Sequence, residues 1–323
     1  MIIAIPDDYQ QLVARLDCYK LLAGHDVRVF QGPARSLDEL VAQLQDAEAI
    51  VPIRERTQFT RELIDRLPRL KLFSQTGRST HHIDVATCTA RGIAVSAGGH
   101  ASPHTIAEHT WALILSVLRD IPGQSARMKR GEWSSHLSIG LRGRVLGIHG
   151  LGKIGALVAL TGKSFGMRVL AFGGEASRGR ATEAGYEFAR DKQQLYAESD
   201  VLSVNLRLSQ QTRHMITAED LALMKPTALF VNTARAEVIA PGALVAALRA
   251  GRPGYAAVDV YENEPVLGGD HPLLKMDNVL CTPHSAWIEK DMYELYFGEA
   301  FANVVRFARG EKVNLVNPEV LKR

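Results

Sequence analysis

Short apolar runs alternate with amphipathic stretches along most of the chain. In the first hundred residues the apolar runs lie at 2–5, 27–30, 49–53, 70–74 and 93–96. The stretches between these runs have helical spacing at 9–22, 36–45 and 61–67. Short apolar runs that alternate with helices are typical of the strands of a parallel sheet. This part of the chain is therefore predicted to fold as an α/β domain.

The same alternation returns in the second half of the chain. Six further apolar runs lie at 145–149, 168–172, 201–206, 228–232, 256–260 and 279–282. Before them, residues 105–119 are apolar on most faces, which predicts a buried helix that crosses from one body to the next. A long amphipathic helix is expected from 287 to 310, and we expect it to pack back on the first body.

Two domains are expected from this pattern and from the length. A chain of 323 residues exceeds the size at which a single hydrophobic core keeps growing. We expect one domain at 102–288. The other is expected at 1–101 together with 289–323, and it is therefore discontinuous in sequence.

Composition argues against several classes of partner. The net charge is +3 and no basic run is dense, so we expect no nucleic-acid partner. No stretch approaches the roughly 18 apolar residues of a membrane helix, so no membrane association and a cytoplasmic location are expected. Cys18, Cys88 and Cys281 lie far apart, are predicted to be reduced thiols, and form no metal-ligand pair. We therefore expect no metal site.

A glycine-rich segment follows the first apolar run of the second set. Gly150, Gly152 and Gly155 have the spacing GxGxxG and are followed by a helix-like segment. In a dinucleotide-binding turn the first glycine makes the turn, the second admits the pyrophosphate and the third lets helix and strand pack closely. An ordinary glycine-rich turn is the alternative. The predicted phosphate-binding residues are Gly150, Leu151, Gly152, Lys153, Ile154 and Gly155.

Three later segments follow predicted strands and carry chemically complementary side chains. They contain Arg235, Glu264 and His284. A guanidinium can bind a carboxylate, an imidazole can transfer a proton near neutral pH, and a carboxylate can orient that imidazole. Taken one at a time, these residues could equally be a surface ion-pair partner, a loop acid and a structural histidine. Together with the glycine turn they favour catalysis.

The order and spacing of these motifs resemble the D-isomer-specific 2-hydroxyacid dehydrogenase family, which includes phosphoglycerate dehydrogenases and glyoxylate/hydroxypyruvate reductases. The resemblance covers nearly the whole chain and rests on the segments 77–84, 107–109, 150–155, 232–235, 259–265 and 282–284. It implies an α/β fold of two doubly wound parallel-sheet domains. These would be a Rossmann dinucleotide-binding domain at 102–288 and a discontinuous, flavodoxin-like substrate domain.

The resemblance also implies an activity and a set of site residues. The activity is hydride transfer between nicotinamide C4 and the C2 carbon of a small 2-oxo or 2-hydroxy acid. Arg235, Glu264 and His284 fall on the family's catalytic arginine, glutamate and histidine. The remaining cofactor contacts fall on Asn205, Thr233 and Asp259, and the substrate contacts fall on Arg54, Gly77, Arg78 and Ser79.

One departure from the family pattern bears on the cofactor. NAD-specific members carry an acid after the second strand of the dinucleotide domain, whereas this chain has Gly173. Ser177, Arg178 and Arg180 follow within a few residues and could bind a 2′-phosphate, so the sequence favours NADP over NAD. Glu175 is the counterargument, because a small shift of its loop would let it bind the ribose.

The resemblance also implies a homodimer, built through the dinucleotide domain and the helix at 105–119. Two other functions stay open. The chain could be a dinucleotide-sensing binding protein of the corepressor type, which shares the fold. It could also be a relative that acts on formate or phosphite.

Overall fold

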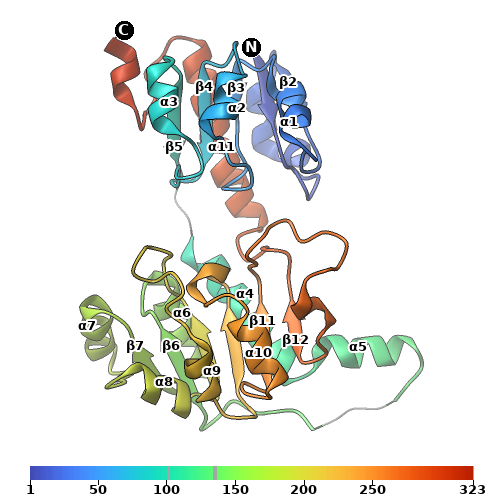
Figure 1. The fold of residues 1–323 in the computed structure, drawn as a ribbon, viewed down its shortest axis with the longest axis vertical. Helices are drawn as coiled ribbons and strands as arrows, with labels where there is room; N and C mark the ends of the chain where they lie inside the picture. Colours follow the sequence, from blue (N-terminus) through green and yellow to red (C-terminus); the bar gives the residue numbers. More distant parts are fainter. Residues whose placement is uncertain (100–101, 134–136, 323) are drawn as a thin grey trace. The chain divides into compact units, whose positions relative to one another are not determined.

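The computed structural model describes residues 1–99, 102–133 and 137–322, and its contacts divide the chain into two compact units (Figure 1). Unit 1 comprises Met1–Ala101 and Ile288–Arg323, and unit 2 comprises Ser102–Trp287. The boundaries expected from the sequence place the second division one residue later, between 288 and 289. Each unit contains its own parallel sheet.

Unit 1 is built on a five-stranded sheet in the order β2-β1-β3-β4-β5. The strands are β1 (Ile2–Ile5), β2 (Asp26–Val29), β3 (Ala49–Ile50), β4 (Leu72–Thr76) and β5 (Ala94–Gly98). The helices are α1 (Leu37–Leu44), α2 (Arg61–Asp65), α3 (Val85–Ala90), α11 (Lys290–Ala308) and the short 3-10 segments η1 (Val13–Arg15), η2 (Asp17–Leu22) and η5 (Pro318–Lys322). Strand order 2-1-3-4-5 is that of flavodoxin-like sheets. The predicted fold of this unit is confirmed.

The helix expected at 9–22 is wrong, because this segment forms η1 and η2 instead. Gln11 has φ +55°, which interrupts any helix at that point. The Asp8 carboxylate accepts hydrogen bonds from the amides of Leu12 and Val13, at 3.2 and 3.1 Å, and so satisfies donors that a longer helix would have used itself. A local side-chain interaction therefore replaces the amphipathic helix.

The C-terminal segments complete unit 1. The helix α11 packs on β4, where Ser74 Oγ donates to the carbonyl oxygen of Ala300 at 2.7 Å. Beyond α11, the buried amide of Asn317 accepts a hydrogen bond from Val95 N–H at 2.8 Å and donates to Ile93 O at 2.9 Å. The last residues of the chain are thus tied to the edge strand β5.

Unit 2 contains a seven-stranded sheet in the order β12-β11-β10-β9-β6-β7-β8. Its strands are β6 (Val145–His149), β7 (Arg168–Phe172), β8 (Glu187–Phe188), β9 (Val201–Val204), β10 (Leu229–Asn232), β11 (Tyr255–Val258) and β12 (Val279–Cys281). Counted from β6, this is the order 3-2-1-4-5-6 of dinucleotide-binding folds with one more strand at the edge. The two-residue strand β8 was not predicted, because it is too short to form an apolar run.

Helices connect the strands of unit 2. They are α4 (Pro103–Leu118), α5 (Ile121–Lys129), α6 (Lys153–Ser164), α7 (Glu175–Ala184), α8 (Lys192–Glu198), α9 (Ala218–Ala222), α10 (Ala243–Arg249) and the 3-10 segments η3 (Ala236–Val238) and η4 (Pro272–Lys275). Among the described residues, no helix is both long and apolar enough to cross a lipid bilayer.

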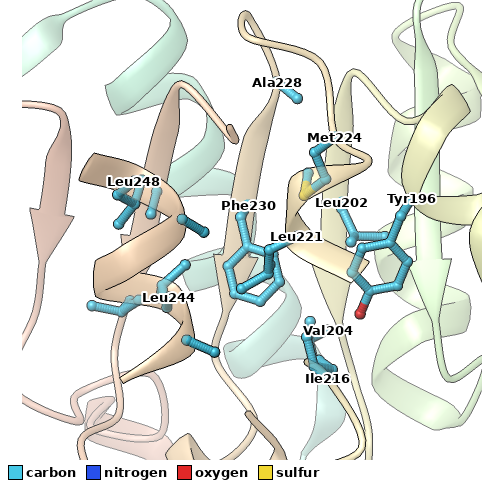
Figure 2. Packing of buried hydrophobic residues seen from close by; sticks show 14 of the residues in the cluster. Tyr196, Leu202, Val204, Ile216, Leu221, Met224, Ala228, Phe230, Leu244 and Leu248 are labelled. Carbon is cyan, nitrogen blue, oxygen red and sulfur yellow. The ribbon is translucent and has the colours of Figure 1, made fainter. Parts of the chain in front are cut away.

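The sheet of unit 2 has a hydrophobic cluster on each face. Successive residues of β10 alternate between them: Phe230 belongs to one cluster, whereas Leu229 and Val231 belong to the other. In the first cluster Phe230 lies among Leu202, Val204 and side chains of α9 and α10 (Figure 2). In the second cluster α4 and α6 cover the opposite face. Burial on both faces holds the sheet rigid, so the loops at its strand ends are well positioned.

Candidate active site

The glycine turn joins β6 to α6. Gly150 has φ +97°, which L residues rarely adopt, and a Cβ there would lie 2.9 Å from the carbonyl oxygen of Asn205. A Cβ on Gly155 would lie 2.3 Å from the carbonyl oxygen of Gly150. A Cβ on Gly152 would meet no heavy atom within 4 Å. Gly150 and Gly155 therefore close the turn, whereas Gly152 leaves the backbone accessible to a ligand.

The N-terminus of α6 is suited to an anion. Its N-cap is Gly152, so no side chain caps its first amides. Those N–H groups and the helix dipole favour a phosphate. The turn itself is held by Ser177, whose Oγ accepts a hydrogen bond from the Leu151 amide at 3.3 Å, and by Arg180, which donates to the Leu151 carbonyl. The glycine turn is thus supported from α7.

The end of β7 carries the predicted 2′-phosphate contacts. A Cβ on Gly173 would lie 2.8 Å from Ser177 Oγ, so a larger residue there requires Ser177 to move. The Arg178 guanidinium stacks on Phe188 at 4.3 Å from the ring centre. The Arg178 side chain is 54% exposed and lies 3.9 Å from Glu175. The structure therefore brings Gly173 and Ser177 together and leaves Arg178 half exposed.

Asn205 and Thr233 follow the neighbouring strands β9 and β10. Asn205 Nδ2 donates to the carbonyl and hydroxyl oxygens of Ser203, while its buried Oδ1 has no hydrogen-bond partner among the described residues. Thr233 Oγ1 lies 2.9 Å from Thr110 Oγ1 on α4. A buried acceptor without a partner costs free energy, so Asn205 Oδ1 is suited to a ligand that donates a hydrogen bond.

Asp259 is a fully buried carboxylate at the end of β11. Burial raises its pKa, but hydrogen bonds from His109, Thr282 and the amides of Ser285 and Ala286 outweigh burial and hold the pKa below its usual value. Oδ1 accepts from Thr282 Oγ1 at 2.5 Å and from Ser285 N at 2.8 Å, and Oδ2 accepts from Ala286 N at 2.9 Å. Asp259 therefore remains ionised and organises the loop after β12.

Glu264 and His284 form a close pair. Glu264 Oε2 lies 2.6 Å from His284 Nδ1, and Glu264 Oε1 accepts a hydrogen bond from the Tyr261 amide at 2.9 Å. About a third of each side chain is exposed, so a ligand can reach the imidazole. His284 has φ +49°, a conformation that is uncommon for a residue with a Cβ. A carboxylate that holds one ring nitrogen leaves the other, Nε2, available for proton transfer.

Arg235 stands at the end of β10, next to β11 in the sheet. The turn that carries it is stabilised by Asn232, whose side chain accepts from the Ala234 amide and donates to the Arg235 carbonyl, both at 3.0 Å. The guanidinium donates from Nη1 to the Ala234 carbonyl at 2.8 Å. Arg235, Glu264 and His284 thus follow three adjacent strands, where ligands bind in open α/β sheets.

The predicted substrate residues lie in unit 1, after β3 and β4. Arg54 has φ +55°, and its guanidinium lies 5.0 Å from the ring centre of Tyr296 on α11. A Cβ on Gly77 would overlap the Arg54 guanidinium, so the structure brings these two residues together. Arg78 Nε donates to the carbonyl of Gly99 at 3.1 Å. Ser79 instead pairs with the ring of His81 at 2.6 Å.

His109 and Thr282 are two further polar residues near the site, and their sequence motifs alone predict no role for them. His109 Nε2 lies 3.1 Å from Thr282 Oγ1, although 173 positions separate the two residues. Both residues belong to segments that carry the family resemblance, and this membership is the one feature of the sequence that could have pointed to them. Only the fold brings them to the same carboxylate. Among the described residues, no group of three His, Cys, Asp or Glu side chains is placed to hold a metal ion.

A doubly wound sheet with a glycine turn and an imidazole–carboxylate pair at its strand ends is typical of dinucleotide-dependent dehydrogenases. Residues 111–286 match the family model described as "D-isomer specific 2-hydroxyacid dehydrogenase, NAD binding domain". The chain belongs to the D-isomer-specific 2-hydroxyacid dehydrogenases, whose members act on CH–OH donors and bind NAD in this domain.

Similar proteins agree with this membership. The chain is 37% identical over 295 residues to a glyoxylate reductase from Aeropyrum pernix, which covers 88% of this chain and 87% of the relative. It is 36% identical to a D-3-phosphoglycerate dehydrogenase from Methanocaldococcus jannaschii, covering 87% of this chain but only 53% of that protein. A crystal structure from Ralstonia solanacearum, described as a putative D-3-phosphoglycerate dehydrogenase oxidoreductase, has 47% identity and a TM-score of 0.94, covering 99% and 98% of the two chains.

Proposed function

We propose that this chain reduces a small 2-oxo acid to the D-2-hydroxy acid, or catalyses the reverse oxidation, with Arg235, Glu264 and His284 as its catalytic groups. The observation that supports this most directly is the contact of 2.6 Å between Glu264 and His284, next to the strand end that bears Arg235. A structural histidine would gain little from a carboxylate in so exposed a position. An imidazole that must be oriented for proton transfer gains its geometry from that contact.

Each side chain has a distinct task in this proposal. A nicotinamide cofactor, when bound, would supply or accept the hydride. His284 Nε2 donates a proton to the substrate oxygen during reduction and accepts it during oxidation, while Glu264 orients the ring through Nδ1. Arg235 binds the substrate carboxylate through charge-assisted hydrogen bonds and polarises the adjacent carbonyl.

The cofactor is proposed to lie along the strand ends of unit 2. Residues 150–155 would hold the pyrophosphate, since the first amides of α6 have no side-chain cap. Asn205, with its unpaired buried oxygen, and Thr233 would contact the nucleoside parts. Asp259 would accept a hydrogen bond from the nicotinamide carboxamide, although four groups of the chain already approach its oxygens.

We further propose that NADP is preferred over NAD. Gly173 offers no carboxylate to repel a 2′-phosphate, and the half-exposed Arg178 can bind one. Ser177 keeps its hydroxyl proton for the phosphate while its oxygen accepts from the Leu151 amide. The proposal is tested by Arg178→Ala, which should raise KM for NADPH by about tenfold and leave KM for NADH unchanged.

The matched control for that test is Arg190→Ala, which removes an equally positive and more exposed side chain. Arg190 is 80% exposed and its Nε lies 3.1 Å from Asp191 Oδ2. It should leave both KM values unchanged. Equal effects of Arg178→Ala on NADPH and NADH would refute the proposed phosphate contact, and a wild-type preference for NADH would refute the cofactor preference.

Arg54, Gly77, Arg78 and Ser79 are proposed to bind the substrate. Arg54 and Gly77 support this best, because the guanidinium lies directly against the glycine backbone after adjacent strands. Arg54→Met should raise KM for the acid by about tenfold while NADH binding stays unchanged. An unchanged KM would remove Arg54 from the site.

A homodimer is proposed through α5 together with Trp133 and Leu137. None of the residues of α5 is buried, and exposed apolar side chains there are Ile121, Met128, Trp133 and Leu137. The expected interface helix, α4, buries six of its sixteen residues, including the large side chains of Trp111, Leu113 and Ile114, and so offers less apolar surface. Sedimentation should give a dimer for the wild type and a monomer for Met128→Glu, whereas Leu274→Glu, which changes another exposed apolar residue, should remain dimeric. A monomeric wild type would contradict the proposal.

The reaction is tested by initial rates with NADPH and NADH on a panel of 2-oxo acids that includes glyoxylate, hydroxypyruvate, pyruvate and phosphohydroxypyruvate. We expect turnover of at least one acid. The His284→Gln variant should lose this turnover but should still bind the cofactor. Cofactor binding without any turnover across the panel would refute the proposed reaction and favour a dinucleotide-sensing role. Oxidation of formate or phosphite in its place would favour the other relatives.

A further inference from the structure

We propose that His109 is a positioning residue for His284 and acts through Thr282 and Asp259. The inference rests on the proposed function, since it assumes that His284 transfers the proton. His109 lies on α4, Asp259 follows β11, and Thr282 follows β12. His109 Nε2 lies 3.1 Å from Thr282 Oγ1 and 3.5 Å from Asp259 Oδ1.

The direction of these hydrogen bonds follows from the number of protons available. Asp259 is ionised and can only accept, so the contact of 2.5 Å with Thr282 Oγ1 needs the hydroxyl proton of Thr282. The hydroxyl has no second proton, so its oxygen must accept from His109. His109 Nε2 therefore carries a hydrogen, and the chain of bonds runs from His109 to Thr282 to Asp259.

This chain of bonds ends on both sides of His284. Thr282 precedes His284 by two residues. Asp259 also accepts hydrogen bonds from the amides of Ser285 and Ala286, the two residues that follow His284. His284 has φ +49°, which a residue with a Cβ keeps only when its surroundings hold it there. The buried carboxylate therefore clamps the backbone on either side of the imidazole.

His109 contributes by keeping Thr282 in the rotamer whose hydroxyl donates to Asp259. Without a donor at Nε2, the Thr282 hydroxyl can rotate away from Asp259. The helix that bears His109 is itself fixed, because the next residue, Thr110, contacts Thr233 beside the strand end of Arg235 at 2.9 Å. We infer that α4 holds the strand ends of β10 and β12 in register for proton transfer.

The experiment uses four variants of the full chain and a matched control. His109→Leu removes the donor, and His109→Gln restores an N–H close to the position of Nε2. Thr282→Val removes the hydroxyl at nearly constant volume, and His109→Leu/Thr282→Val combines both changes. His104→Leu makes the same chemical change at an exposed position of α4 and should keep wild-type rates.

We expect His109→Leu to lower kcat about tenfold, with KM and the Kd for NADH changed less than about twofold. The primary isotope effect with NADH deuterated at the transferred position should rise, since hydride and proton transfer become slower. His109→Gln should recover most of the rate. The double variant should lose no more than the larger of the two single losses, because both changes break one chain of bonds.

Additive losses in the double variant would overturn the inference, as would no recovery in His109→Gln at an unchanged melting temperature. A rise in KM or in the Kd for NADH without a fall in kcat would assign His109 to binding and would also overturn it. Failure of the proposed function looks different, because the wild-type chain then shows no turnover at all. In that case the melting temperatures of the same variants still test the network of hydrogen bonds. The double variant should then lower the melting temperature by less than the sum of the two single variants.

Discussion

Gly155→Ala is the most direct test of how the glycine turn is built. The added Cβ would lie 2.3 Å from the carbonyl oxygen of Gly150, whereas real Cβ atoms essentially never come within 3.0 Å, so the gap must open by about 0.7 Å. The nearest atoms are backbone, so no side chain can rotate to make room. The helix α6 must therefore move away from the turn that would hold the pyrophosphate.

The cost can be estimated from the packing. Overpacking of this kind costs about 1–3 kcal/mol, and the gain in helix propensity from glycine to alanine returns at most about 1 kcal/mol. We expect a net loss of roughly 1 kcal/mol, or a few degrees in Tm for a unit of this size. The affinity for NADH should fall at least about tenfold, because the first amides of α6 would move out of hydrogen-bonding distance of the pyrophosphate.

Two other glycines provide controls. Gly152→Ala places a Cβ where no heavy atom lies within 4 Å, so Tm should stay unchanged while NADH binding weakens. Gly179→Ala adds a methyl group to the exposed side of α7, again with no neighbour within 4 Å, and should raise Tm slightly. The measurements are thermal melts with and without NADH and fluorescence titration of NADH. If Gly155→Ala melts and binds NADH like Gly179→Ala, the steric reasoning is refuted.

Three further predictions concern the site and the two sheets. Glu264→Gln should lower kcat by about 10²-fold without changing the Kd for NADH, as judged by initial rates and titration; a change in Kd alone would speak against an orienting role. Asn317→Leu should leave the buried Val95 amide and the Ile93 carbonyl unpaired and lower the free energy of unfolding by about 3 kcal/mol, measured by urea denaturation. A loss below about 1 kcal/mol would show that the hydrogen bonds of Asn317 to the β5 edge contribute little. Burial lowers the pKa of His82 to about 4 from its ordinary 6.5. The unfolded chain therefore binds the proton first as pH falls, so stability should decline from pH 6.5 towards 4 by up to about 3 kcal/mol for this group. His82→Met should flatten that decline only in part, because burial lowers the pKa of His149 to about 4 as well; an identical slope in the variant would contradict the assignment.

Local patterns were sufficient for much of the fold. The alternation of apolar runs located all but the two-residue strand β8, and the first strand, 2–5, was predicted to the residue. Strands buried on both faces carry an apolar signal that is strong and contiguous, which explains this success. The helix at 9–22 failed because the Asp8 carboxylate competes for the backbone, an interaction that periodicity does not report.

The candidate site divides in the same way. The sequence by itself determined the family, the glycine turn and the positions of Arg235, Glu264 and His284, because each lies in a short contiguous motif whose chemistry can be read in one dimension. Tertiary structure alone decided which side chains meet. It joined His109 to Thr282 across 173 positions, turned Ser177 towards the Leu151 amide, and surrounded Asp259 with donors from the loop after β12. The physical reason is that hydrogen bonds depend on distance and direction in space, which only the packed sheet defines.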